Sequence, residues 1–222
     1  MNIKETISIN YHKFQTYITA LVIRLKKSKA IVLTGCGRSG TRYSSKLLRK
    51  CGLHIGHEKL FFNGISSWRI VSDSTEPFMG PSFNEIKMLD RVMIHQVREP
   101  LSSISSMLTI GKPSWEFIAK EIPVNLDKDS SILKAMKYYF YWNLKAETIT
   151  DYRVKAETFS DDIRPILIDQ GITFNDKLND IKAKDAVNTR KHQILTWEDL
   201  NKEDPDLTGK IRLLGTRYGY DN

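Results

Sequence analysis

The chain has few of the residues that mark a disulfide-rich or metal-dependent scaffold. Its 222 residues include only two cysteines, Cys36 and Cys51, without a CxxC spacing. A helix between them would hold them roughly 15 Å or more apart, too far for a disulfide, because a helix rises ~1.5 Å per residue. No cluster of histidine, cysteine and carboxylate residues has metal-ligand spacing. We therefore predict a reducing compartment, no disulfide framework and no bound metal.

The sequence also lacks a long apolar run. The longest near the amino terminus, residues 17–25, is interrupted by Thr19 and Arg24 and is far shorter than the ~20 residues of a spanning helix. No signal-peptide layout with a small-residue cleavage site is present. These features predict a soluble, cytoplasmic protein without a transmembrane segment, and the initiating methionine favours a bacterial or viral origin.

What the chain does have is a positive charge balance and enough apolar residues for a core. Apolar residues make up 41% of the sequence, and 34 Lys and Arg outnumber 26 Asp and Glu, for a net charge of +8. This surplus favours anionic partners such as nucleotides or acidic glycans without choosing among them, since the basic residues are spread along the chain. A solvated basic surface is the alternative.

The pattern along the chain predicts an α/β fold. Residues 30–34 are a β-branched apolar run typical of a buried strand, and the glycine-rich residues 35–40 lead into helical spacing over 41–50. Further strands are expected at 90–97 and 151–154, and further helices at 101–108, 131–150 and 161–170. We therefore predict a P-loop-type parallel sheet flanked by helices, as a single three-layer domain.

No internal repeat or linker divides the sequence, so residues 1–222 are expected to form one domain. Apolar positions with helical spacing, followed by Lys26, Lys27 and Lys29, predict an amphipathic helix within residues 1–29. We expect this helix to pack on the domain, with docking on a membrane surface as the alternative. The last fifty or so residues are polar with isolated apolar positions, and no element is predicted there.

The predicted strand, glycine-rich turn and helix around residue 38 have the arrangement typical of a phosphate-binding loop. Glycines let successive N–H groups point inward, and the helix amino terminus adds partial positive charge. Gly35 and Gly40 have the spacing of the nucleoside-triphosphate loop, but the next residue is Thr41 rather than lysine. The cation lies inside the loop instead, at Arg38. The loop therefore predicts an anion site unlike that of an ordinary ATPase or kinase, with a ligand-free tight turn as the alternative.

Two segments resemble the sulfotransferase family. Residues 37–41, Gly-Arg-Ser-Gly-Thr, look like the loop that binds the 5′-phosphosulfate of 3′-phosphoadenosine-5′-phosphosulfate (PAPS), in the form found in protein-tyrosine and several carbohydrate sulfotransferases. Arg98, Pro100 and Ser106 match the family's R-x-P-x-x-x-x-x-S pattern for the donor's 3′-phosphate. The resemblance implies a PAPS-dependent sulfotransferase whose donor contacts Gly37, Arg38, Ser39, Gly40, Thr41, Arg42, Arg98 and Ser106.

A third segment, Gly56-His57-Glu58, resembles the segment that supplies the catalytic glutamate in protein-tyrosine sulfotransferases. The resemblance implies that Glu58 is the general base and that Arg38 neutralises the leaving oxygen. His57 is the competing base, because histidine is the commonest proton acceptor near neutral pH. A basic segment that contains Arg190 faintly resembles the part of the family that covers the 3′-phosphate.

The resemblance implies transfer of a sulfuryl group from PAPS to a hydroxyl or amine, which leaves 3′-phosphoadenosine-5′-phosphate (PAP). A small-molecule or carbohydrate acceptor is expected, with no nucleic acid, and the oligomeric state is left open. Two rival functions are a nucleotide kinase or NTPase with an altered loop, and a non-catalytic protein that binds an anionic polymer. Asp90 opens its predicted strand instead of closing it, which weakens the first rival, because a metal-binding carboxylate belongs at the strand's carboxyl end.

Overall fold

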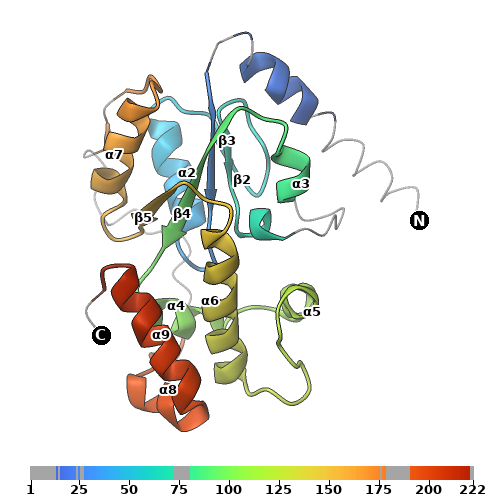
Figure 1. The fold of residues 1–222 in the computed structure, drawn as a ribbon, viewed down its shortest axis with the longest axis vertical. Coiled ribbons are helices and arrows are strands. Elements are labelled where there is room, and N and C mark those ends of the chain that lie inside the picture. Colours follow the sequence, from blue (N-terminus) through green and yellow to red (C-terminus); the bar gives the residue numbers. More distant parts are fainter. Residues whose placement is uncertain are drawn as a thin grey trace.

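The computed structural model describes residues 14, 16–23, 25, 28–72, 81–175, 177, 178 and 191–220. They form an α/β domain on a five-stranded sheet in the order β2-β3-β1-β4-β5, in which all pairs are parallel (Figure 1). The predicted fold class, a parallel sheet flanked by helices, is confirmed. The strands are β1 (Ala30–Thr34), β2 (Ile55–His57), β3 (Gly64–Ser66), β4 (Arg91–Val97) and β5 (Tyr152–Lys155).

Helices cover both faces of the sheet and continue beyond its carboxyl-terminal edge (Figure 1). Residues 16–23 are also helical. The labelled helices are α2 (Thr41–Lys50), η1 (Trp68–Val71), α3 (Phe83–Ile86), α4 (Pro100–Met107), α5 (Lys112–Glu121), α6 (Ser131–Glu147), α7 (Phe159–Asp169), α8 (Trp197–Glu203) and α9 (Pro205–Arg217).

β1 is the central strand, and all five of its residues are buried. Its side chains alternate between the two faces, as the period of two of a strand requires. Ile31 and Leu33 join the cluster under α2 and α7, while Ala30 and Val32 join the cluster on the opposite face with Ile23. Burial on both faces explains why this strand reads as an uninterrupted apolar run.

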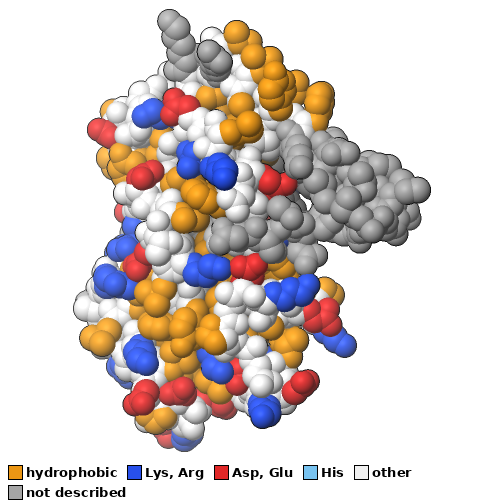
Figure 2. All heavy atoms as spheres, turned by 45° about the vertical axis from the view of Figure 1, so that its right-hand side comes forward, with side chains coloured by type: hydrophobic (Ala, Val, Ile, Leu, Met, Phe, Trp, Pro, Cys, Tyr) orange, Lys and Arg blue, Asp and Glu red, His pale blue; other side chains and the backbone are white. Residues whose placement is uncertain are grey.

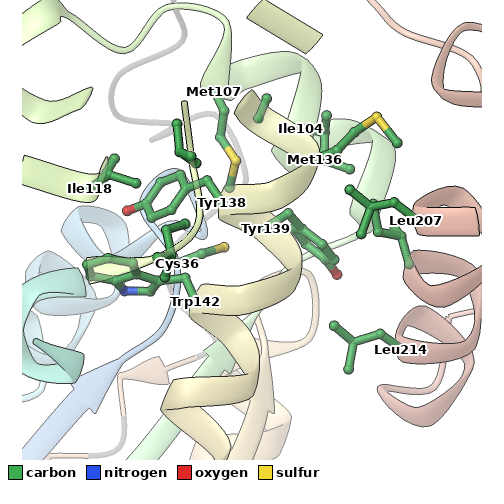
Figure 3. Packing of buried hydrophobic residues seen from close by; sticks show 14 of the residues in the cluster. Cys36, Ile104, Met107, Ile118, Met136, Tyr138, Tyr139, Trp142, Leu207 and Leu214 are labelled. Carbon is green, nitrogen blue, oxygen red and sulfur yellow. The ribbon is translucent and has the colours of Figure 1, made fainter. Parts of the chain in front are cut away.

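A second region of the molecule lies beyond the carboxyl ends of the strands and is almost entirely helical. Its core gathers residues of α4, α5, α6, α8 and α9. Figure 3 shows that Tyr138 and Trp142 lie on one side of α6, while Tyr139 lies on the side that faces Leu207 and Leu214 of α9. The aromatic run of residues 138–142 is therefore mainly core. We refer to α4, α5, α6, α8 and α9 as the helical half and to the sheet with α2, α3 and α7 as the sheet half.

The predicted elements agree with the structure where a strand or helix was predicted, and they are incomplete in both halves. Every predicted strand and helix after residue 30 is present, with bounds that differ by no more than three residues. The sequence did not predict β2, β3, η1 and α3 between residues 55 and 86, or α5, α8 and α9. In α9 the apolar positions are few, yet Leu207, Ile211 and Leu214 are all buried against the helical core.

The two cysteines are buried and are not bonded to each other. In the described part of the chain, no helix combines the length and the apolar character that crossing a bilayer requires.

Candidate functional site

The segments that carry the predicted site residues meet at one cavity of about 510 Å³ at the carboxyl ends of the strands. Sheets of this kind bind ligands at this edge, outside the strand ends. The volume falls within the ordinary range for a small-molecule site. The lining residues with a predicted role are Gly37, Arg38, Gly40, Thr41, Arg42, His57, Glu58, Arg98 and Ser106.

The register of the sheet explains why segments far apart in sequence converge here. Leu33 of β1 pairs with Ser66 of β3, and Ser66 pairs with His57 of β2. Because the strands are parallel, the residues that follow each one lie at the same edge. On the other side, Thr34 pairs with His95, so Arg98 leaves β4 beside the start of the loop.

Two side chains from other elements hold the loop in place by hydrogen bonds to its backbone. The Tyr138 hydroxyl accepts a hydrogen bond from Gly37 N at 2.9 Å, and Gln96 Nε2 donates to Ser39 O at 2.7 Å. A Cβ at Gly37 would lie 2.7 Å from the Tyr138 hydroxyl, so no larger residue fits here without a shift. Gly40, with φ of 91°, takes the left-handed conformation that favours glycine, directly before α2. The loop therefore has a defined conformation, in which the glycines would let a ligand approach the backbone closely.

Two predicted donor contacts differ from the expectation. The N–H groups of Gly37 and Ser39 are already paired inside the protein, with Tyr138 and with Cys36 O. Ser39 is completely buried and does not line the cavity. The anion-binding groups that face the cavity therefore come from Arg38 and from the residues that begin α2, Thr41 and Arg42.

The amino terminus of α2 gives the cavity a positive potential. The first N–H groups of a helix have no intrahelical acceptor, and the helix dipole adds partial positive charge there. No acidic residue occupies the first turn of α2, and Arg42 lines the cavity beside it. An anion is therefore favoured at this point.

Arg38 connects the loop with α4. Its backbone has φ of 72°, and its guanidinium Nε donates to Ser106 Oγ at 3.0 Å while Nη2 donates to Thr109 Oγ1 at 2.7 Å. Arg98 Nη1 in turn donates to Arg38 O at 3.1 Å. The sequence assigned Arg38 and Ser106 to opposite ends of the donor, but in the structure they are in direct contact. The two arginine side chains therefore form one continuous basic surface along the cavity.

His57 ends β2 and Glu58 follows it, on the other side of the cavity. Glu58 has φ of 57°, an uncommon value for a residue that is not glycine. Its Oε1 accepts a hydrogen bond from Trp68 Nε1 at 3.2 Å and lies 3.9 Å from His57 Nε2. Burial lowers the pKa of His57, and Arg42 and Arg49 act in the same direction, while Glu58 opposes them. The neutral imidazole of His57 can therefore accept a proton, and the Glu58 carboxylate is oriented by a neighbouring hydrogen-bond donor.

Several lining residues have no counterpart in the sequence prediction. Trp68 and Tyr138 line the cavity, and their rings pack against each other and against Trp142. The aromatic density of residues 138–142 was a signal for a core, and it could not show that one hydroxyl reaches the loop. The other such lining residues are Tyr43, Ile110, Gly111, Ser114 and Ile118.

Arg190, predicted to cover the donor, lies outside the described residues. Among the residues that the structure describes, no group of three His, Cys, Asp or Glu side chains is arranged to hold a metal ion. Comparison with protein-family models, with curated proteins and with solved structures found no match.

Proposed function

We propose that the chain binds PAPS in this cavity and transfers its sulfuryl group to a hydroxyl or amine acceptor. The observation that carries the proposal is that Arg38, Arg98, the amino terminus of α2 and Glu58 line the same cavity. A bisphosphorylated, sulfated nucleotide needs several cationic and amide donors in one place. The transfer also needs a proton acceptor on the side from which the acceptor approaches.

The character of the cavity walls supports a polyanionic ligand. Arginine offers a planar fork of donors that suits phosphate oxygens, and charge-assisted hydrogen bonds of this type are about twice as strong as neutral ones. We assign the 5′-phosphosulfate to the start of α2 and the 3′-phosphate to Arg98 and Ser106. Arg38 joins the two ends, and a hydroxyl that accepts one hydrogen bond, as that of Ser106 does, can still donate another.

In the proposed reaction the acceptor oxygen or nitrogen forms a bond to sulfur while the bond between sulfur and the phosphate oxygen breaks. The electron pair of the broken bond stays on the phosphate, and the acceptor's proton passes to Glu58. Arg38 and the N–H groups of α2 stabilise the charge that develops on the leaving oxygen. Trp68 holds Glu58 Oε1, which leaves Oε2 to take the proton.

The same walls make the kinase alternative less suitable. Lysine is missing after Gly40, and Asp90 precedes β4, at the opposite edge of the sheet from the cavity. A metal–ATP complex would need a carboxylate near the β- and γ-phosphates. Glu58 is the acidic residue that lines the cavity, and it is held by Trp68 on the β2 side.

The test is a comparison of three nucleotides by titration calorimetry: PAP, adenosine 5′-monophosphate and ATP with magnesium. We expect PAP to bind at least about tenfold more tightly than the monophosphate, because a charge-assisted contact contributes about 1.5–3 kcal/mol. Tighter binding of ATP with magnesium would replace the proposal with a kinase or NTPase. Absence of binding by all three would reject a nucleotide site.

Arg98→Ala tests the assignment of the 3′-phosphate. It should remove the preference for PAP over the monophosphate and leave monophosphate binding nearly unchanged. Arg91→Ala is the matched control, because Arg91 begins the same strand at the opposite edge and its guanidinium donates to Lys87 O and Leu89 O. Retention of the preference in Arg98→Ala would contradict the assignment.

A further inference from the structure

The helix at residues 16–23 turns its larger apolar side chains outward. Phe14, Tyr17, Leu21 and Leu25 are between 45% and 74% exposed, whereas Thr16, Thr19 and Ile23 are at most 3% exposed. Figure 2 shows hydrophobic side chains gathered at the top of the molecule, over this helix. The sequence predicted an amphipathic helix that packs on the domain. It does pack there, but through two threonines, Ala20 and Ile23.

The outward residues form a continuous stripe. At 3.6 residues per turn, positions 14, 17, 21 and 25 fall on one side of the helix, and positions 16, 19 and 23 fall on the other. Single exposed apolar residues are common on protein surfaces, but a contiguous set that includes two aromatic rings marks an interaction surface.

The charge of the surrounding sequence indicates which kind of partner would suit this exposed stripe. Residues 6–57 contain ten Lys and Arg and no Asp or Glu, while the rest of the chain carries 24 basic and 26 acidic residues. The basic residues are spread along the chain, but the positive surplus is concentrated in this segment because it contains no acidic residue. Four of these cations adjoin the stripe in sequence: Lys13, Arg24, Lys26 and Lys27.

We propose that this helix docks the protein on an anionic lipid surface. Aromatic and leucine side chains enter the boundary between headgroups and acyl chains, and the flanking cations attract anionic headgroups. A second copy of the chain is a poorer occupant, because two basic segments would meet across the contact. The lipid boundary is a fluid, apolar layer under negative charge, so it fits a protruding stripe without a complementary groove.

The position of the helix is compatible with catalysis on such a surface. It lies beside the sheet near the start of β1, whereas the cavity lies at the carboxyl ends of the strands (Figure 1). Docking would therefore leave the cavity open. The proposal does not depend on which nucleotide the cavity binds.

The experiment is sedimentation of the full chain with vesicles of phosphatidylcholine alone, or of phosphatidylcholine mixed with phosphatidylglycerol. We expect at least about tenfold tighter binding to the mixed vesicles, weakened by added salt, because cations near such a surface are attracted to anionic headgroups and salt screens that attraction. A Phe14→Ser/Tyr17→Ser/Leu21→Ser variant should lose at least about tenfold of that affinity. Lys26→Gln/Lys27→Gln should reduce the preference for the mixed vesicles.

The control is Ile194→Ser/Leu213→Ser, which removes two apolar side chains that are 83% and 73% exposed elsewhere on the protein. It should bind vesicles as the unaltered chain does. Equal binding to both vesicle types, equal loss in the control, or no vesicle binding would overturn the proposal. Concentration-dependent dimers that the triple serine variant abolishes, without vesicle binding, would assign the stripe to a second copy instead.

Discussion

The two halves of the molecule contribute different things to one cavity. The sheet half supplies the charged and proton-accepting groups, since the loop, Arg42, Glu58 and Arg98 follow its strands and His57 ends β2. The helical half supplies the closing wall, with Ser106, Ile118 and Tyr138. The difference teaches that chemistry is concentrated at the strand ends, whereas fit and exclusion of water depend on helices that pack later in the chain.

The largest expected effect is the loss of kcat on substitution of Glu58, which lies in the sheet half. Glu58→Gln keeps the size of the side chain but removes its ability to accept a proton. We expect kcat for sulfuryl transfer from PAPS to fall by about 10²–10⁴-fold, and PAP affinity to change little. Steady-state kinetics and calorimetry measure the two effects. If His57→Gln causes the larger loss of kcat, the base is His57.

The contact between the halves should weaken in acid. His95 of β4 bonds to Asn143 of α6 at 3.0 Å and packs on Tyr218, and burial lowers its pKa to about 4 from an ordinary value of 6.5. The unfolded chain binds this proton first, so stability is complete above about pH 6.5 and is lost as the pH falls towards 4, by about 3 kcal/mol. Urea unfolding across this range measures it. His95→Gln should lose correspondingly less stability on acidification, and an equal loss would exclude His95 as the cause.

Two core substitutions compare the halves directly. Trp142→Phe and Phe159→Leu both alter fully buried rings and should each lower the free energy of unfolding by roughly 1–3 kcal/mol. Trp142 also donates from Nε1 to Trp68 O at 2.9 Å, so its replacement should weaken PAP binding as well. Phe159 packs under the sheet with α2 and α7, away from that wall. Equal effects on PAP affinity would contradict the division between the halves.

The smallest effect is expected where the helical half holds the loop. Tyr138→Phe removes the acceptor of the Gly37 N–H group and leaves a buried donor unpaired, at a cost of about 1–2 kcal/mol. We expect PAP affinity to fall about tenfold. Tyr141→Phe in the same helix is the control. Unchanged PAP affinity in Tyr138→Phe would show that the loop does not need this support.

The centre of the sheet half could be predicted because its signals are local, whereas the three-residue strands β2 and β3 could not. The apolar run of β1, the glycines after it and the helical spacing of α2 are contiguous in sequence. The helical half could not be predicted in the same way. Leu207, Ile211 and Leu214 acquire their role only when α9 packs on α6, a contact between distant segments.

The candidate site shows the same limit. Arg38 could be named from the glycine-rich loop, and Arg98 and Ser106 from the resemblance of their segment, but their direct contact could not be predicted. Trp68 and Tyr138 were missed because a ring that lines a cavity and a ring that fills a core have the same sequence pattern.

The sequence by itself determined the parallel α/β fold and the glycine-rich loop between β1 and α2, because these depend on local patterns of hydrophobicity and backbone freedom. Only the tertiary structure decided which of those residues share a cavity, which loop amides are already paired, and that the amino-terminal helix exposes its apolar stripe. The reason is physical: strand register and helix packing bring together groups that the chain separates by tens of residues.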